Sequence, residues 1–432
     1  MPSHHSPITL AIDFGTSNSL AGAVQDGQRV EALALDNEAS DPSLMRTLMY
    51  FANADECYYG STAIKMFLEN EMEGRLFRSF KSHLPNASYL GTTIERRVLR
   101  LEDMIGIFLL EIKKRAEKIL GQSIDQAVIG RPARYSMEDV ADGFALHRMA
   151  KAAEFAGFKN FSFVPEPLAA ALDFRRGLKD EKIVLIGDFG GGTSDFTIMK
   201  MSPQPFNKKD VLAVDGCPLA GDALDSVFMS ERLNRSFGAQ TKYRLPLPSN
   251  ILSMPVALMN CLNKPSYIVH LKERENYHFL QEVKKCALTE KDKIALNRLF
   301  ILMDDQQVFP FFEEIEKTKR QLSVQDKFEF NFLYPDLETK DLFFASEFEQ
   351  WAAKIQEAIF QAIERCLRQA QLNDGDIDLV FLTGGTAHVP FVRKTFEKRF
   401  GTAKLQGQSF FHSVLSGLIE AAKLGDKIGN FK

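Results

Sequence analysis

Two short stretches of this 432-residue chain combine an aspartate with a turn rich in glycine and hydroxyl side chains. Residues 13–17 read DFGTS and follow an apolar run, and residues 188–194 read DFGGGTS and follow another. Because glycine lacks a Cβ atom, such turns let consecutive backbone N–H groups approach an anion, and nests of this kind bind phosphate. The aspartate that precedes each turn would repel a bare phosphate, so we expect a counter-cation, for which oxygen-liganded Mg²⁺ is the natural choice.

Neither loop is conclusive by itself, because a hairpin with glycine at its turn needs no ligand. The shared DFG lead favours two related lobes, each of which offers one loop to a polyphosphate–Mg²⁺ complex. The phosphate motifs GxxxxGK[ST] and GxGxxG are absent from the sequence.

Three further groups of residues could contact a ligand. Glu166 stands between two prolines, which stiffen its backbone, although a carboxylate at a helix N-terminus is also favoured by the helix dipole alone. A second group lies on one face of a predicted helix, where it could contact a sugar and a base or simply face solvent, and consists of Glu316, Lys319, Arg320 and Ser323. Gly384 and Gly385 follow an apolar run and would allow close approach of a ligand.

Apolar runs and helical periodicity alternate along the chain, which predicts an α/β protein. We expect strands at residues 8–14, 20–24, 126–129, 183–189, 195–199 and 378–383. We expect helices at residues 62–71, 101–120, 136–155, 313–322, 347–370 and 412–424. Gly121 is the predicted C-cap of the second helix, and Ser136 with Asp139 resembles a capping box for the third.

The composition excludes several classes of function. With 53 Lys and Arg against 57 Asp and Glu, the net charge of −4 argues against a general nucleic-acid binder and against a polybasic membrane-surface protein. No apolar run approaches the ~20 residues that a membrane helix needs. The N-terminal residues lack the apolar core of a signal peptide, and the five cysteines show no CxxC spacing, so we expect a cytoplasmic protein without a zinc site.

Taken in order, these motifs resemble the nucleotide-binding domain of the seventy-kilodalton heat-shock chaperones, the DnaK family. The resemblance runs from about residue 8 to residue 424 and is weakest at residues 36–75 and 240–300. It is closest to the truncated YegD-like branch, because only 42 residues follow Pro390 and no peptide-binding domain is expected. The resemblance implies the actin-like ATPase fold, with lobe I at residues 1–180 and lobe II at residues 181–432. The smaller subdomains would span about residues 36–100 and 222–312.

The resemblance also implies roles for individual residues. Lys81 would stabilise charge that develops on the γ-phosphate, with Arg78 as the alternative, and Glu166 and Asp195 would position the attacking water or accept its proton. Asp13 and Asp188 would hold Mg²⁺ through waters. The implied phosphate contacts are Gly15, Thr16, Ser17, Asn18, Gly190, Gly191, Gly192 and Thr193. Gly221 and Asp222 are implied nucleotide contacts. The implied adenosine contacts are Glu316, Lys319, Arg320, Ser323, Gly384, Gly385, Thr386 and His388.

Three departures from the family pattern affect these expectations. His388 stands where an arginine usually packs on the adenine, and Phe411 stands where an acidic residue is usual. Residues 240–300, which carry exchange-factor contacts in the family, depart most. We therefore expect nucleotide exchange to be unaided or to use other partners.

The sequence predicts a slow ATPase that acts as a nucleotide-dependent switch on a protein partner, with ATP or ADP and Mg²⁺ as cofactors. The sequence does not name that partner or client. Three alternatives share the duplicated loops or the fold: a small-molecule kinase, a filament-forming protein, and a domain that binds nucleotide without turnover.

Overall fold

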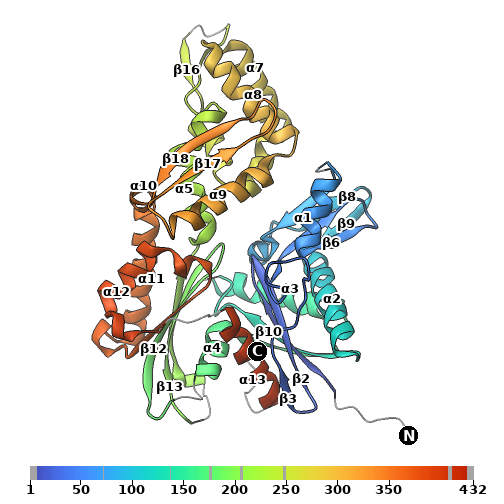
Figure 1. The fold of residues 1–432 in the computed structure, drawn as a ribbon, viewed down its shortest axis with the longest axis vertical. Helices are drawn as coiled ribbons and strands as arrows, with labels where there is room; N and C mark the ends of the chain where they lie inside the picture. Colours follow the sequence, from blue (N-terminus) through green and yellow to red (C-terminus); the bar gives the residue numbers. More distant parts are fainter. Residues whose placement is uncertain are drawn as a thin grey trace. The chain divides into compact units, whose positions relative to one another are not determined.

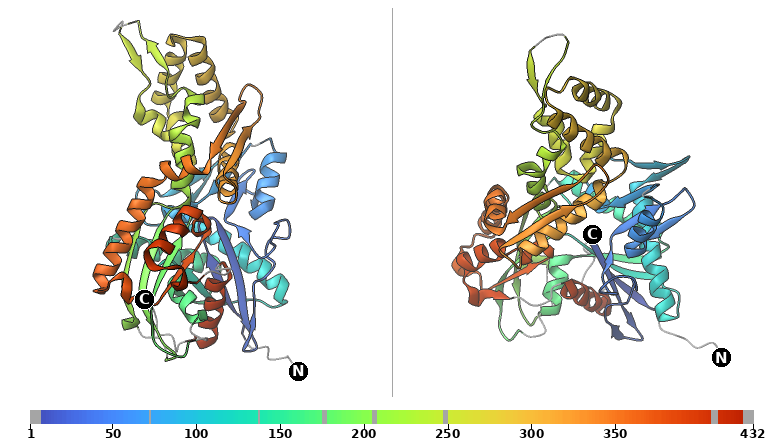
Figure 2. Two further views of the ribbon diagram at one scale, coloured as in Figure 1. Left: turned by 60° about the vertical axis from the view of Figure 1, so that its left-hand side comes forward. Right: turned by 45° about the horizontal axis from the view of Figure 1, so that its top comes forward.

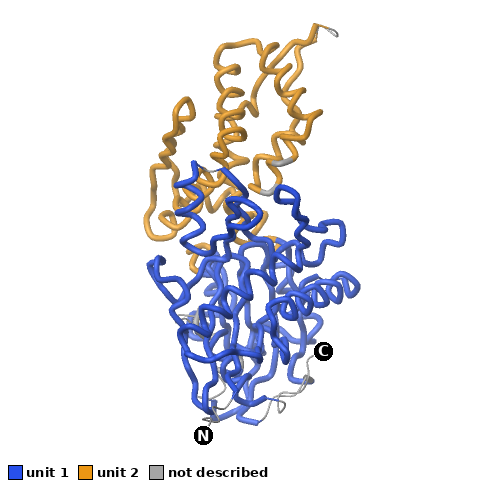
Figure 3. The backbone as a smooth tube through the Cα atoms, turned by 90° about the vertical axis from the view of Figure 1, so that its right-hand side faces the viewer, with its two compact units in different colours: residues 1–218, 359–387, 392–432 blue, residues 219–358, 388–391 orange. Residues whose placement is uncertain are grey.

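The computed structural model describes residues 7–71, 73–136, 138–174, 178–204, 208–246, 250–406 and 411–425. The chain divides into two compact units, coloured blue and orange in Figure 3. Unit 1 contains residues 1–218, 359–387 and 392–432, and unit 2 contains residues 219–358 and 388–391. The lobe boundaries expected from the sequence stay a prediction.

The first sheet of unit 1 has parallel strands on one side of an antiparallel hairpin (Figure 1). Its strands are β1 (Thr9–Phe14), β2 (Asn18–Gln25), β3 (Gln28–Val30), β4 (Met45–Arg46), β10 (Gln126–Arg131) and β11 (Asn160–Pro165). Strand β1 pairs antiparallel with β2 and parallel with β10, and β10 pairs parallel with β11. Strands β3 and β4 both pair antiparallel with β2.

The second sheet of unit 1 has the same plan. Its strands are β12 (Lys182–Phe189), β13 (Ser194–Met201), β14 (Val211–Cys217), β19 (Leu379–Thr383) and β20 (Leu405–Gln406). Strand β12 pairs antiparallel with β13 and parallel with β19, β13 pairs with β14, and β19 pairs parallel with β20. The hairpin β12–β13 therefore corresponds to β1–β2, which confirms that the repeated DFG motif marks two related hairpins.

Helices cover both faces of the first sheet. The helices of unit 1 include α2 (Leu101–Leu120), α3 (Asp139–Phe155), α4 (Glu166–Phe174) and α13 (Phe411–Leu424). Helices α2 and α3 contribute Phe108 and Met149 to a core that also contains Leu10, Ile12 and Phe14 of β1. Because alternate residues of a strand point to opposite faces, β1 is buried on both sides and consists mostly of apolar residues.

A second core joins the two sheets of unit 1. It contains Leu168 of α4, Leu418 of α13, and side chains from β1, β2, β12 and β19. Helix α13 lies beside β1 and β2 (Figures 1 and 2) and packs closely on α4. A Cβ atom on Gly417 would come within 1.6 Å of the carbonyl oxygen of Ala169, so the small residues of both helices permit this approach. The packing fixes α4, whose first residue is Glu166.

The other face of the second sheet is covered by α11 (Ala353–Ala370) and α12 (Pro390–Phe400). Phe396 of α12 contacts the rings of Phe189 and Phe196 on the strands and of Phe360 on α11. Aromatic packing of this kind buries a large apolar area. It holds β12 and β13 in place behind the loop that joins them.

The rest of the first half of the chain forms small sheets around helix α1. These elements are β5 (Leu48–Phe51), β6 (Cys57–Tyr59), α1 (Gly60–Glu69), β7 (Arg75–Arg78), the 3-10 helix η1 (Phe80–His83), β8 (Gly91–Ile94) and β9 (Arg97–Arg100). Strand β5 pairs with β6 and β7, and β8 pairs with β9. The short helix η1 follows β7 directly and carries Lys81.

Unit 2 consists of helices and two small hairpins. Its elements are α5 (Gly221–Glu231), η4 (Leu233–Phe237), β15 (Lys242–Arg244), β16 (Ile251–Ser253), α6 (Val256–Asn260), η5 (Cys261–Asn263), η6 (Pro265–Lys272), α7 (Arg274–Cys286), α8 (Glu290–Asp304), α9 (Val308–Leu322), β17 (Lys327–Phe332), β18 (Thr339–Phe344) and α10 (Ala345–Trp351). Phe311 of α9 contacts Phe330 and Phe332 of β17, and Phe228 of α5 contacts Phe343 of β18. These rings account for part of the high phenylalanine content.

Several helix boundaries differ from the prediction. Helix α9 begins at Val308 and not at residue 313, and α1 spans Gly60–Glu69 and not residues 62–71. Helix α3 begins at Asp139, without a side-chain cap, because the Ser136 hydroxyl accepts from the backbone of Glu138 at 3.2 Å in a turn before the helix. The predicted helix over residues 347–370 is two helices, α10 and α11, because Ala352 interrupts it with a ψ angle of −4°. By contrast, α2 ends at Leu120 and Gly121 adopts φ of 70°, as predicted.

No helix in the described ranges is long and apolar enough to cross a membrane.

Candidate functional site

The turn between β1 and β2 requires glycine. A Cβ atom on Gly15 would lie 2.3 Å from the backbone oxygen of Asn18, which is closer than a carbon atom can approach. Thr47 fixes the same turn, because its hydroxyl donates to the Gly15 carbonyl at 2.8 Å and its N–H donates to Ser17 O at 2.8 Å. These bonds engage two carbonyl oxygens that would otherwise repel an anion at this turn.

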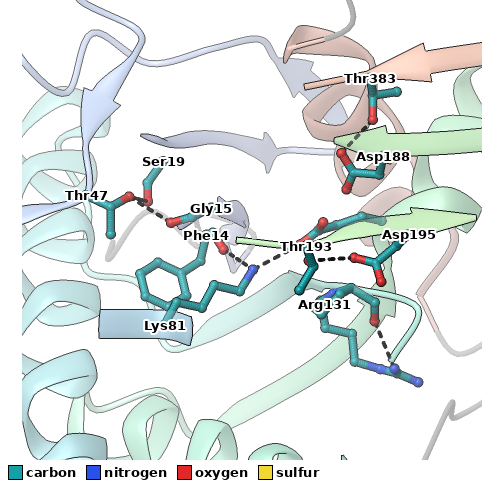
Figure 4. Close-up of polar contacts among 12 residues, drawn as sticks. Phe14, Gly15, Ser19, Thr47, Lys81, Arg131, Asp188, Thr193, Asp195 and Thr383 are labelled. Atoms are coloured by element: carbon teal, nitrogen blue, oxygen red, sulfur yellow. Dashed lines mark hydrogen bonds and ion pairs between the residues drawn. The ribbon is translucent and has the colours of Figure 1, made fainter. Parts of the chain in front are cut away.

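The hairpin of β12 and β13 carries a pair of carboxylates. Asp188 and Asp195 stand opposite each other in the hairpin, and the Gly190 N–H donates to Thr193 O at 3.0 Å. The Thr193 hydroxyl donates to Asp195 at 2.8 Å, and the Thr383 hydroxyl donates to Asp188 at 2.7 Å (Figure 4). Each carboxylate therefore has one hydroxyl donor.

Lys81 connects the two hairpins through Glu166. Its ammonium group donates to the carbonyl oxygen of Phe14 and, at 3.2 Å, to a carboxylate oxygen of Glu166 (Figure 4). The Lys81 side chain is only 7% exposed. Glu166 in turn interacts electrostatically with Asp188 and with Asp13. The structure thus brings five of the predicted site residues into one cluster in unit 1, which consists of Asp13, Lys81, Glu166, Asp188 and Asp195.

Burial and mutual repulsion disfavour the charged forms of the aspartates in this cluster. Burial, followed by the charge of Glu166, raises the pKa of Asp13 to about 7. Burial also raises the pKa of Asp195 to about 7, against the hydrogen bond from Thr193. The same two causes, burial and Glu166, raise the pKa of Asp188 well above its usual range. Removal from water and neighbouring like charge both favour a protonated carboxyl.

In contrast to the aspartates, Lys81 is favoured in its charged form. Burial alone would lower the pKa of Lys81, but the charges of Glu166 and Asp13 and the hydrogen bond to Glu166 raise it above its usual value. The ammonium group therefore stays charged at neutral pH and can attract an anion.

The cluster has more negative than positive charge. In the described part of the chain, no three His, Cys, Asp or Glu side chains are arranged to bind a metal ion directly. The donor set is made entirely of oxygen and is suited to a hard divalent cation that keeps its waters. A cation of this kind would relieve the repulsion that raises the pKa values of the aspartates, so the residues fit Mg²⁺ bound through waters.

Unit 2 holds a second cluster, between α5 and α9. Lys319 of α9 pairs with Asp225 of α5 at 2.8 Å and approaches Gly221 O at 3.4 Å. Burial raises the pKa of Asp225 to about 6, with Lys319 opposing and with Glu316 and Asp222 adding to the rise. The predicted helix face thus lies against α5, whose first residues are the predicted contacts Gly221 and Asp222.

The other two residues of that helix face are arranged differently. The Ser323 hydroxyl donates back to Lys319 O at 3.0 Å at the end of α9. The Arg320 side chain is exposed and makes no hydrogen bond or ion pair with any described residue. A guanidinium in this state can stack on a flat ring.

The predicted adenosine loop follows β19 as a short 3-10 helix, η8 (Gly385–His388). Gly384 adopts φ of 84°, and a Cβ atom there would lie 2.1 Å from Phe189 O, so its glycine is required by the neighbouring hairpin. Gly385 has open space around its Cα atom, Thr386 is buried, and His388 is exposed. The side chain of Phe411 lies outside the described residues.

Sequence reasoning missed four residues near the cluster in unit 1, which are Thr47, Arg131, Tyr135 and Thr383. Thr47 contacts Gly15 across 32 positions of sequence, so no local pattern reveals it. Arg131 and Tyr135 could have been found, because they follow a predicted strand parallel to β1 and the C-terminal ends of parallel strands meet at one edge of a sheet.

Two sheets of one topology, whose hairpin loops meet at one carboxylate–lysine cluster, define an actin-like ATPase fold. The family model described as Hsp70 protein matches residues 81–243 and 289–409, more than half of the chain, and the chain therefore belongs to the Hsp70 family. Members of this family are ATP-binding chaperone-type ATPases. The first glycine-rich loop, residues 13–17, lies before the matched segments. Residues 244–288, within the region that departs most from the family pattern, lie between them.

Proposed function

We propose that this chain binds Mg²⁺–ATP, hydrolyses the terminal phosphate, and changes its binding of a protein partner with the nucleotide state. One observation carries the proposal: the buried Lys81 ammonium bonds Glu166, beside three aspartates from two glycine-rich hairpins. Membership of the Hsp70 family supports it, and so does the oxygen-only donor set. Within the family, the YegD-like branch stays a prediction.

Each loop has a role in holding the phosphates. The backbone N–H groups and hydroxyls of residues 15–18 and 190–193 would bind the phosphate oxygens. Asp13 and Asp188 would hold Mg²⁺ through waters, and the bound ion would neutralise part of the phosphate charge. Lys81 would donate to the γ-phosphate, on which negative charge develops.

Two carboxylates are suited to the attacking water. Asp195 is held by Thr193 at 2.8 Å, and burial raises its pKa to about 7, close to the working pH that suits a general base. Glu166 would orient the water, because Lys81 holds its carboxylate at 3.2 Å beside Asp188. Since this chemistry is mostly positioning and electrostatics, we expect slow turnover without a partner.

The unit 2 cluster would bind the adenosine part of the nucleotide. Glu316 and Lys319 are suited to ribose hydroxyls, and the unpaired Arg320 guanidinium is suited to the adenine ring. The exposed imidazole of His388 can also stack on a base. Gly221, Asp222, Ser323, Gly384, Gly385 and Thr386 complete the proposed adenosine contacts.

The test is phosphate release from Mg²⁺–ATP by the wild-type protein, by Asp188→Asn and by Asp125→Asn. Asp125 is a matched control, because it is an aspartate of unit 1 whose carboxylate pairs with Lys159 at 2.6 Å on the surface. We expect release from the wild type and from Asp125→Asn, and loss of at least roughly a hundredfold in Asp188→Asn.

Equal release by Asp188→Asn and the wild type would refute the site assignment. ATP binding without release would leave a binding-only switch. Phosphate transfer to a small-molecule acceptor in place of water would identify a kinase.

A further inference from the structure

Tyr135 lies on a short segment that is fixed at both ends. The segment leaves the C-terminal end of β10, where the Arg131 guanidinium donates to Pro132 O at 3.0 Å and to Ala133 O at 2.8 Å. The backbone N–H of Tyr135 donates to the Asp142 carboxylate at 2.6 Å. The Tyr135 ring packs against the core of the first sheet. The side chain therefore has a defined position.

That position is at the same edge of the sheet as Lys81 and Glu166. Strand β10 lies between β1 and β11, and all three are parallel. Arg131 is paired with Pro165, the residue before Glu166, and β1 ends at Phe14, whose carbonyl binds Lys81. The Tyr135 side chain interacts electrostatically with both Lys81 and Glu166.

The Tyr135 hydroxyl is buried and has no hydrogen-bond partner among the described residues. An unsatisfied buried hydroxyl destabilises the folded state, and phenylalanine would fill the same space without that cost. Burial raises the pKa of Tyr135 to about 12, so the phenol keeps its proton and can donate it at any working pH. A stability cost at a catalytic cluster is typical of a group that meets its partner only when a ligand is bound.

We propose that the Tyr135 hydroxyl is a further catalytic group of this site, which donates a hydrogen bond to an oxygen of the terminal phosphate of ATP during hydrolysis. This inference rests on the proposed ATPase function. Together with Lys81, the phenol would supply two donors to the oxygens on which charge increases as the bond to the leaving group breaks.

The test is Tyr135→Phe, which removes only the hydroxyl. We expect kcat for phosphate release to fall roughly tenfold to a hundredfold, KM for ATP to change less than about twofold, and the Tm to stay equal or rise. Tyr50→Phe is the matched control. The Tyr50 hydroxyl is also buried in unit 1, but it donates to Glu73 O at 2.8 Å and accepts from Asn70 at 3.1 Å. Its loss should lower the Tm and leave kcat unchanged.

Wild-type turnover by Tyr135→Phe would overturn the inference, whatever happens to the Tm. If the wild type binds nucleotide but releases no phosphate, calorimetric titration with ADP and with ADP–aluminium fluoride still tests the inference about Tyr135. Weaker binding of the fluoride complex alone by Tyr135→Phe supports the inference, and equal affinities overturn it. A wild type that binds neither ligand refutes the proposed function, and with it this inference.

Discussion

Lys81 in unit 1 and Lys319 in unit 2 each lie among several carboxylates, but the two lysines have different partners. Lys319 pairs directly with Asp225 at 2.8 Å. Lys81 divides its hydrogen bonds between Glu166 and the carbonyl oxygen of Phe14, and it pairs with none of the three neighbouring aspartates in the described contacts.

The pKa values follow this difference. In unit 2, Lys319 opposes the effect of burial, and the pKa of Asp225 reaches only about 6. In unit 1, Asp13 and Asp195 both reach about 7, and the pKa of Asp188 is also raised well above its usual range. Asp225 in unit 2 therefore has a direct counter-charge, whereas the unit 1 aspartates lack one in the described contacts and become charged only at a higher pH. We infer that the unit 2 cluster is suited to uncharged groups of a ligand and the unit 1 cluster to a cation together with an anion.

The largest effect should come from Lys81→Ala. It removes the donor that would stabilise charge on the γ-phosphate, so we expect phosphate release to fall by at least roughly a hundredfold while ATP still binds. Lys113→Ala is the matched control, because Lys113 also donates to a backbone carbonyl, Gly157 O at 2.9 Å, but on the surface. Equal turnover by Lys81→Ala and Lys113→Ala would show that Lys81 does not stabilise charge on the γ-phosphate. The proposed difference between the unit 1 and unit 2 clusters would then be wrong.

Lys319→Ala should act on binding and not on the chemical step. It leaves Asp225 and its acidic neighbours without their counter-charge, so we expect the Kd values of ATP and ADP to rise about tenfold, with kcat at saturating ATP within about twofold. Calorimetric titration and phosphate release measure the two effects separately. The control is Lys317→Ala on the same helix, whose side chain pairs with Glu314 at 3.0 Å. A fall in kcat larger than the change in Kd would contradict the assignment of unit 2 to binding.

Thr383→Val tests the hydroxyl donor to Asp188. Without it the pKa of Asp188 should rise further, because a hydrogen bond to the charged form is lost. We expect phosphate release to fall roughly fivefold at pH 7, with a deficit that grows as the pH falls. Thr197→Val is the control, since the buried Thr197 hydroxyl has no hydrogen-bond partner among the described residues. A deficit that does not depend on pH would argue against this role of Thr383.

The smallest effect is a difference in thermal stability without nucleotide or metal. Asp195 has a folded-state pKa of about 7 against an ordinary value of 3.8, so the folded state binds a proton more tightly than the unfolded state. The free energy of unfolding therefore falls as pH rises from about 4 to 7 and is level above that range. Asp195→Asn removes this contribution, so its Tm relative to the wild type should increase by a few degrees across the same interval.

The matched comparison is Asp225→Asn in unit 2. The pKa of Asp225 is about 6, so its Tm difference from the wild type should increase over a narrower interval, from about pH 4 to 6, and by less. Identical profiles for the two variants would show that the clusters do not differ in charge balance.

Much of the fold could be predicted because its signals are local. Helix α2 and strand β12 agree with their predicted ranges to within a residue, since periodicity, apolar runs and Gly121 determine them. The repeated DFG motif predicted two related hairpins, and the sheets confirm it. The start of α3 was mispredicted, because the sequence does not show whether Ser136 caps the helix or the preceding turn.

The candidate site was predictable only as separate pieces. Loop composition identified both glycine-rich turns, and family resemblance supplied Lys81, for which composition has no signal. Contacts across the sheet edge were only partly predictable. Thr383 lies 195 positions from Asp188, and no local pattern links the two residues. Tyr135 follows a predicted strand, but its place beside the cluster follows only once β10 is known to lie between β1 and β11.

The sequence by itself therefore determined the α/β class, the repeated hairpins and the identity of the loops, because backbone conformation and burial pattern depend on residues close in the chain. Only the tertiary structure decided which carboxylates lie around Lys81, which aspartates have a raised pKa, and that the buried Tyr135 hydroxyl has no partner among the described residues. These properties depend on distances between groups far apart in the chain and on how much water the fold excludes from them, and neither quantity is encoded in local spacing.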